Sequence, residues 1–248
     1  MKLLLLGSVG YHPNDRRHTA CLMLPELGVI FDAGTAIYRV PEYLSADADT
    51  LDIFLSHAHL DHVVGLTFMF DVLQGRQMNR VTVHGEPEKL QAIRDHLFSE
   101  YLFPVAPPFD MKSLVPRIVL ADGGVLTHFP LRHPGGSVGF RIDWPDRSFA
   151  YVTDTVAAAD ADYVEKIRGV DLLVHECNFG DDQPEQAELT GHSCITPVAQ
   201  VAAAAEVGRL VLVHLNPLLE NENELNLSAV RKTYPHIEVG FDRMEIDF

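Results

Sequence analysis

The 248-residue sequence has few cysteines, few basic residues and no long hydrophobic run. Its three cysteines, Cys21, Cys177 and Cys194, are scattered and odd in number, so they form neither a disulfide framework nor a Cys-x-x-Cys zinc site. We therefore expect a reducing, cytoplasmic location. The apolar core of Met1–Gly7 is too short for a signal peptide and predicts a first strand. No run approaches the length of a membrane span, so we expect no membrane partner.

Basic residues are outnumbered, since 19 Lys and Arg stand against 35 Asp and Glu and give a formal net charge of −16. Affinity for nucleic acid comes mostly from the neutralisation of phosphates by Lys and Arg. This balance disfavours a long nucleic acid and favours a small substrate. A hydrophobic content of 47% is enough for a substantial core. Because we find no linker, repeat or low-complexity tract, we predict a single domain over residues 1–248.

One hexapeptide, His57-Ala58-His59-Leu60-Asp61-His62, holds three imidazoles and a carboxylate. The apolar segment Leu51–Ser56 before it predicts a short buried strand, and Val63–Phe70 after it predicts the start of a buried helix. In an extended turn the first two histidines point to the same side, whereas the acid and the last histidine come from the first helical turn. Imidazole and carboxylate are ligands for divalent metals. The hexapeptide therefore predicts part of two adjacent metal sites.

This His-x-His-x-Asp-His pattern after a buried strand resembles the signature of the metallo-β-lactamase superfamily. The family pattern also has a distant His, a distant Asp and a last His, each at the end of a strand, and this sequence offers His133, Asp154 and His214. With these residues the resemblance covers nearly the whole chain. It implies an α/β fold, the αββα sandwich of two mixed sheets with helices on both outer faces.

The resemblance also implies a centre for two divalent metal ions with room for a bridging water. Such a centre generates a hydroxide nucleophile at neutral pH. The imidazole ligands make Zn the first choice of metal, and the carboxylates make Mn or Fe the next. One ion would be held by His57, His59 and His133 and the other by Asp61, His62 and His214, with Asp154 between them.

A second stretch, Gly191-His192-Ser193 before a predicted helix, is similar to a segment of the phosphodiesterase branch of the superfamily. We predict His192 as the general acid for a departing alkoxide, because imidazole titrates near neutral pH. The structural alternative is a loop histidine that caps the next helix. His175-Glu176-Cys177-Asn178 resembles the His-Glu-Ala-Thr motif of tRNase Z. We expect Glu176 to orient a histidine and His175 to be structural. The catalytic candidates are His192, Asp61 and Glu176.

Two departures separate this chain from named branches. The tRNase Z family carries a long arm between its third His and its bridging Asp, and here the interval from His133 to Asp154 holds two predicted strands and a turn. Phosphoribosyl cyclic phosphate phosphodiesterases share a short interval, but they have an N-terminal cysteine cluster for a structural zinc. In this part of the chain only Cys21 is present.

We therefore predict a dinuclear metal-dependent hydrolase, a phosphodiesterase that acts on a small or cyclic phosphodiester through a metal-bridging hydroxide. The first alternative is a lactonase or thioesterase of the glyoxalase II type, in which His192 would be dispensable. The second is a tRNA 3′-processing endonuclease. A non-hydrolytic sensor of the same fold is a third class, and it has no need of an open two-metal centre. A homodimer is a further hypothesis.

Patterning predicts other elements. The aromatic, proline-rich stretch Phe98–Phe109 predicts an irregular loop that either packs on the core or forms a lid or subunit contact. The acidic stretch Gly180–Leu189 is predicted to be exposed. Thr196-Pro197 predicts the start of a helix through Val207, with Thr as the cap and Pro in the first position. Strands are predicted over Val115–Leu120, Gly124–Leu131, Ser137–Trp144, Ser148–Thr153 and Val170–Val174.

Overall fold

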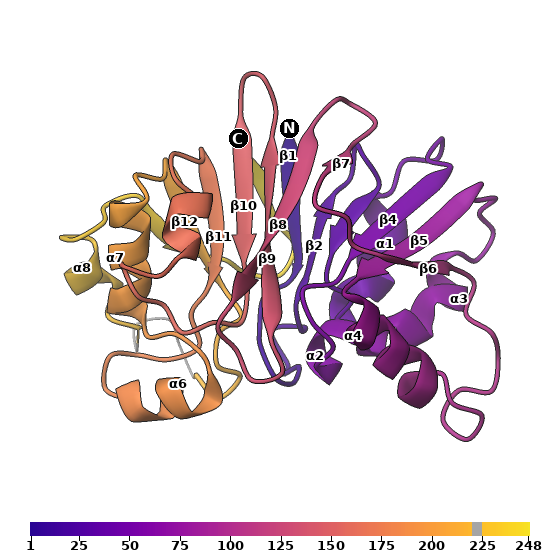
Figure 1. The fold of residues 1–248 in the computed structure, drawn as a ribbon, viewed down its shortest axis with the longest axis horizontal. Helices are drawn as coiled ribbons and strands as arrows, with labels where there is room; N and C mark the ends of the chain where they lie inside the picture. The colour runs from indigo at the N-terminus through magenta and orange to yellow at the C-terminus, as the bar shows by residue number, and fades with distance from the viewer. Residues whose placement is uncertain (220–224) are drawn as a thin grey trace. The chain divides into compact units, whose positions relative to one another are not determined.

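Two seven-stranded sheets organise the chain in the computed structural model, which describes residues 1–219 and 225–248 (Figure 1). Each sheet belongs to its own unit. The first unit comprises Met1–Val115 and Phe241–Asp247, and the second comprises Pro116–Gly240 and Phe248. The assignment of residues 1–248 to one domain stays a prediction.

The sheet of the first unit has the strand order β14-β1-β2-β3-β4-β5-β6. Strands β3 to β6 are parallel, whereas β14, β1, β2 and β3 pair antiparallel. The strands are β1 (Lys2–Gly7), β2 (Cys21–Leu24), β3 (Val29–Phe31), β4 (Thr50–Phe54), β5 (Arg80–Gly85), β6 (Asp110–Ser113) and β14 (Met244–Asp247). The helices are η1 (Thr35–Arg39), α1 (Val40–Tyr43), α2 (Leu60–Val63), η2 (Val64–Phe68), α3 (Met69–Val72), α4 (Pro87–Ala92) and η3 (Ile93–Leu97).

Strand β4 places the hexapeptide at the carboxyl end of a parallel sheet. Its residues Leu51 and Ile53 are fully buried in one core cluster with Val63 and Leu66 of the helices that follow. Gly65 allows these helices to approach the turn after β3, because a Cβ on Gly65 would lie 2.2 Å from the Gly34 carbonyl oxygen. The strand and the helices therefore fix both ends of the hexapeptide.

The sheet of the second unit has the strand order β13-β12-β11-β10-β9-β8-β7. Strands β10 to β13 are parallel, and β7 to β10 pair antiparallel. The strands are β7 (Ile118–Val119), β8 (Val125–Leu131), β9 (Ser137–Asp143), β10 (Ser148–Val152), β11 (Leu172–Glu176), β12 (Arg209–Val213) and β13 (Ile237–Val239). The helices are α5 (Tyr163–Lys166), α6 (Pro184–Thr190), α7 (Ile195–Ala204) and α8 (Leu227–Val230).

Helix α7 covers the parallel part of this sheet (Figure 1). Its residues Val198, Val201 and Ala202 are fully buried in one cluster with Leu173 of β11 and Leu210 of β12. Val201 and Ala202 are three and four positions after Val198, so the three side chains lie on one stripe of the helix, as packing against a sheet requires. Burial of such apolar surface stabilises the unit by about 25 cal/mol per Å².

Several predicted boundaries are wrong. Strand β7 covers only Ile118–Val119 of the predicted Val115–Leu120, and β6 was missed. The acidic stretch Gly180–Leu189 is largely exposed as predicted, but α6 within it was missed; this helix begins at Pro184, a residue that fits the first helical position. Helix α7 begins at Ile195 after the N-cap Cys194, and the Thr196 hydroxyl does not cap it because it donates to Asp181 Oδ2 at 2.6 Å.

The aromatic loop combines packed and exposed side chains. Phe98 and Phe109 pack against the core of the first unit, with ring centroids 5.7 Å apart. Tyr101 and Leu102 are 94% and 72% exposed. The lid and the homodimer contact stay predictions. Within residues 1–219 and 225–248, we find no helix with the length and apolarity that a membrane span requires.

Candidate functional site

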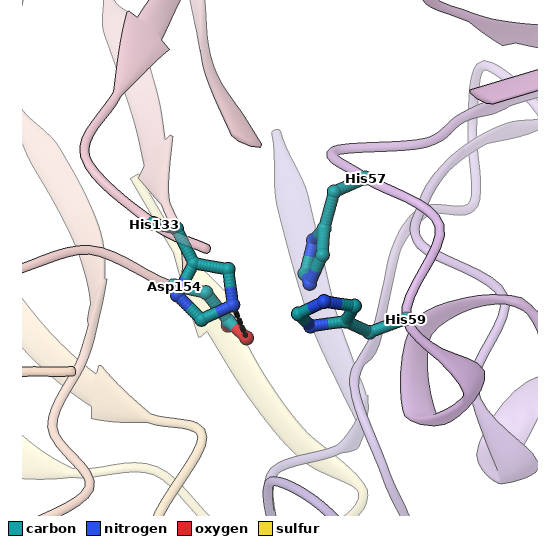
Figure 2. A group of neighbouring side chains, drawn as sticks. All are labelled: His57, His59, His133 and Asp154. Carbon is teal, nitrogen blue, oxygen red and sulfur yellow. Dashed lines mark ion pairs between the residues drawn. The ribbon is translucent and has the colours of Figure 1, made fainter. Parts of the chain in front are cut away.

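The hexapeptide forms a compact group, which we call the first half-site: His57, His59, Asp61 and His62. The rings of His57 and His59 lie next to each other, with centroids 4.5 Å apart (Figure 2). The His57 and His62 centroids are 4.2 Å apart. Nε2 of His62 lies 3.4 Å from Oδ2 of Asp61. The four predicted ligands of this unit therefore gather at one point.

A buried carboxylate, Asp32, orients the first half-site. It is fully buried, and one oxygen lies 2.9 Å from His62 Nδ1. The backbone N–H and hydroxyl of Ser56 both donate to its other oxygen at 2.8 Å. When Nδ1 of His62 donates its proton to Asp32, Nε2 keeps its lone pair for a metal.

The same end of the sheet holds Asp61 and His57 in place. The backbone N–H of Tyr11 donates to Asp61 Oδ2 at 2.7 Å. Tyr11 has a φ of +62°, an unusual value for a residue with a side chain. Nδ1 of His57 lies 3.0 Å from the Ser56 hydroxyl. The orientation of these side chains thus depends on a backbone N–H and a neighbouring hydroxyl, and not only on the sequence of the hexapeptide.

The second unit contains a group that we call the second half-site: His133, Asp154, His192 and His214. Oδ2 of Asp154 lies 3.6 Å from His133 Nε2, the contact that is dashed in Figure 2, and Oδ1 lies 3.3 Å from His214 Nε2. Ligand atoms of Asp154, His192 and His214 lie within 4.8 Å of one another. One carboxylate oxygen thus faces each of two imidazoles, an arrangement in which Asp154 can serve two ions.

Two loop contacts orient the second half-site. His133 Nδ1 lies 2.8 Å from the Gly191 carbonyl oxygen and can donate its proton to it. Gly191 follows α6 with a φ of +77°, and a Cβ there would lie 2.9 Å from His133 Nδ1, so glycine is required. The side-chain amide of Asn178 donates to the His214 carbonyl oxygen at 3.1 Å. His214 itself has a φ of +54°, which this hydrogen bond helps to hold.

Glu176 lies against His192. Its side chain is fully buried, and Oε1 lies 3.3 Å from His192 Nδ1. Backbone N–H groups of Thr155 and Asn178 donate to its two oxygens at 3.1 Å. These donors hold the buried carboxylate in a fixed orientation, as a residue that positions a histidine requires. The catalytic roles of Glu176, His192 and Asp61 stay predictions.

The neighbouring His175 points elsewhere. Its Nε2 lies 3.0 Å from the Tyr163 hydroxyl, and its Nδ1 lies 2.7 Å from the Glu176 carbonyl oxygen. Burial lowers its pKa below the ordinary value for histidine. These contacts agree with the structural assignment made from the sequence.

The residues present fit divalent cations. In both half-sites the donors are imidazole nitrogens and carboxylate oxygens, and four of the histidines have Nδ1 within 3.3 Å of an oxygen partner. Such partners fix the tautomer that leaves Nε2 as a ligand.

The cysteines of the second unit are not reactive thiols. Burial raises the pKa of the Cys177 thiol, and it raises the pKa of the Cys194 thiol to about 11, so neither thiol is poised to ionise at neutral pH.

Comparison with known proteins places the fold and the family. A family model described as a beta-lactamase superfamily domain matches residues 28–215. A ribonuclease Z of Synechococcus sp. (strain CC9605) is 38% identical over 315 aligned positions, which cover 100% of this chain and 98% of the relative. The metallo-beta-lactamase fold protein YhfI of Bacillus subtilis has a TM-score of 0.79 and 18% identity, with 99% of both chains covered. A diphosphatase of the PhnP family has a TM-score of 0.72 and 21% identity, with 100% of this chain and 97% of that chain covered.

Two mixed sheets with helices and these matches define an α/β hydrolase with a group of candidate metal ligands. The chain belongs to the metallo-β-lactamase superfamily. The predicted superfamily, fold class and assignment as a hydrolase are therefore confirmed. The set of seven metal ligands and the identity of the metal stay predictions.

Sequence reasoning missed the residues that orient the ligands. Asp32 follows a buried strand before Ala33-Gly34, and an acid in that place is a signal for a buried partner. Asn178 belongs to the predicted motif, but its contact with His214 was not predicted. No feature of the sequence indicates that the carbonyl oxygen of Gly191 contacts His133. These contacts depend on how distant segments pack.

Proposed function

We propose that this hydrolase is a metal-dependent phosphodiesterase that acts on a small or cyclic phosphodiester. The observation that carries the proposal is Asp154, with one oxygen toward His133 and the other toward His214. His192, within 4.8 Å of two of these ligands, adds a proton donor beside the same carboxylate. A hydrolase of phosphodiesters needs both a place for cations and a group that protonates the departing oxygen.

His57, His59 and His133 would hold one divalent ion and Asp61, His62 and His214 the other, with Asp154 shared. Bound ions supply Lewis acidity, which polarises phosphoryl oxygens and lowers the pKa of water. Asp32 and the Gly191 carbonyl oxygen keep His62 and His133 in the tautomer that presents Nε2.

His192 is the proton donor in this proposal. An oxygen of water forms a bond to phosphorus and loses a proton to solvent. The bond from phosphorus to the departing oxygen breaks, and that oxygen takes the bond's electron pair and a proton from His192. Glu176, 3.3 Å from His192 Nδ1, holds the ring so that its other nitrogen faces the reacting group. His192 then regains a proton from solvent.

Three observations favour a small substrate. The interval from His133 to Asp154, where tRNase Z carries its long arm, here forms β9 and β10 with a turn between them. The net charge of −16 opposes a long polyanion. In addition, the alignment with the Synechococcus relative runs over 315 positions, more than the 248 residues of this chain, so the relative carries segments that this chain lacks.

An endonuclease that processes tRNA 3′ ends is the second candidate. It is favoured by the name ribonuclease Z of a relative that is 38% identical along the whole chain. A small RNA with a short 3′ trailer is the substrate that distinguishes the two candidates, because a small-diester enzyme cleaves it far more slowly than a cyclic nucleotide.

The test is hydrolysis of bis-(p-nitrophenyl) phosphate and adenosine 2′,3′-cyclic phosphate by protein loaded with Zn or Mn, for the wild type and His192→Ala. We expect metal-dependent turnover, and on the cyclic diester a loss of about 10²-fold or more in kcat for His192→Ala with metal content unchanged. The activated nitrophenyl diester should lose less. A fully metallated wild type that hydrolyses neither diester would contradict the proposal, and lactones and thioesters would be assayed next.

A further inference from the structure

A pocket of about 410 Å³ lies beside His192 in the second unit. It is formed by the start of α7 and by α6, with the segment after β10 as a third wall. Its walls are mostly apolar, and two carboxylates stand among its lining residues. The lining residues include Ala157, Ala187, Ser193, Thr196, Asp181 and Glu188.

The polar groups of the walls already have partners within the protein. The Ser193 hydroxyl donates to the Thr155 carbonyl oxygen at 2.7 Å and accepts from the Ala157 N–H at 3.0 Å. The Thr196 hydroxyl donates to Asp181. The interior of the pocket therefore offers mainly van der Waals contact, from Ala157, Ala187 and their apolar neighbours, and favours an organic group with apolar surface.

The pocket carries two carboxylates. Asp181 and Glu188 are carboxylates, and none of the described residues that line the pocket is Lys or Arg. Glu188 is about half exposed and forms an ion pair with Arg132, which does not line the pocket. Asp181 accepts from the Thr196 N–H at 3.0 Å. A second negative charge inside the pocket would face both carboxylates, and among the described lining residues only a protonated His192 would offset them, so a negatively charged group is disfavoured.

We infer that this pocket binds the leaving group of the substrate, and that the leaving group is a neutral or cationic organic alcohol with one ring or a similar volume. The inference rests on the proposed function. A proton donor must lie about 2.6–3.2 Å from the oxygen that it protonates. His192 lines the pocket, so a leaving oxygen next to His192 would place the rest of its group at the pocket.

The inference is tested with two diesters that differ in one charge: methyl p-nitrophenyl phosphate and methyl 3-carboxy-4-nitrophenyl phosphate. The wild type should hydrolyse the neutral leaving group with a kcat/KM about 10-fold higher, since like charges in a partly closed site repel. Glu188→Lys should reduce this ratio to about 2-fold. Glu185→Lys is the matched control, because it makes the same charge change on the same helix at a residue that does not itself line the pocket, and it should preserve the ratio.

Binding of the free alcohol separates this inference from the proposed function. Phenol and 3-hydroxybenzoate are titrated into the metal-loaded wild type while NMR follows the methyl groups of Ala157 and Ala187. Phenol should shift both methyl signals, and 3-hydroxybenzoate should shift them at about 10-fold higher concentration. Equal responses to both compounds, no response at these methyls, or equal turnover of the two diesters would overturn the inference. A wild type that binds phenol here but cleaves no diester would support the pocket and refute the phosphodiesterase.

Discussion

The two half-sites contain similar candidate metal-binding side chains but are built in different ways. The first takes four predicted ligands from six consecutive residues after β4. The second collects His133, Asp154, His192 and His214 from four segments that are far apart in the sequence. Parallel pairing of β10 with β11 and of β11 with β12 brings the carboxyl ends of these strands to one edge. Local sequence thus specifies one half-site, and sheet register specifies the other.

The contacts that orient the histidines are similar in the two half-sites. Each half-site relies on an acid that lies outside its ligand set, Asp32 for His62 and Glu176 for His192. Asp32 is 30 residues from His62, so even the local half-site needs a distant segment. Substitutions of ligands and of orienting acids therefore show how far the two half-sites are equivalent.

The largest effect is expected for Asp154→Ala. Because its two oxygens face His133 and His214, its loss should lower the affinity for both ions and reduce turnover by more than the ~10–100-fold that loss of an outer partner costs. Metal content by mass spectrometry and turnover of the cyclic diester measure this. Asp171→Ala, a carboxylate of the same unit that bonds Ser148, is the control. A variant that kept both ions would show that Asp154 is not shared.

Glu176→Gln should come next. It keeps the shape of the side chain but weakens the contact with His192 Nδ1, so we expect kcat to fall by about 10–100-fold with metal content near that of the wild type. Comparison of its pH–rate profile with the wild type tests whether the residue acts through His192, because a purely structural defect would lower the rate equally at all pH values. Loss of metal instead would assign His192 to the ligands.

Asp32→Asn makes the corresponding change in the first half-site. The amide can no longer accept from both Ser56 and His62 with a full charge, so we expect metal affinity to fall by about 10-fold or more. Competition with a chelator measures the affinity. Asp52→Asn, a carboxylate of β4 that contacts Arg80 and His84, should leave the affinity unchanged. Equal affinities for Asp32→Asn and the wild type would contradict the role of Asp32.

The difference between the half-sites also explains what the sequence could predict. The hexapeptide is contiguous, so its residue types, a flanking strand and a helix are enough to identify it. His133, Asp154 and His214 were found through resemblance to a family pattern, because no local property of the chain states that β10 lies between β9 and β11. Short elements such as β6 and α6 were missed since their formation depends on tertiary partners more than on local pattern.

The smallest effect concerns the stability of the first unit. Burial alone would raise the pKa of the Asp52 carboxyl. Hydrogen bonds from His84 and Arg80 outweigh this effect and lower the pKa of Asp52 from 3.8 to about 2. A carboxyl with a lowered folded-state pKa stabilises the fold above pH ~4 and loses this contribution as the pH falls through about 2. We expect about 1 kcal/mol, reduced by solvent screening at the exposed Arg80.

Urea unfolding of the wild type and Asp52→Asn at pH 5 and pH 2 measures this contribution. The stability difference between the two proteins should shrink at the lower pH, and titration of other carboxyls cancels in the comparison. A difference that stays constant would mean that the Asp52 contacts do not depend on its charge.

The central proposal is that this chain binds two divalent ions. The most direct measurement is the number of ions per chain after incubation with Zn or Mn and removal of excess metal, for the wild type, His57→Ala and His214→Ala. The account predicts about two ions for the wild type and about one or fewer for each variant. Fewer than one ion per wild-type chain would contradict it and would favour a protein that keeps the fold without hydrolytic activity.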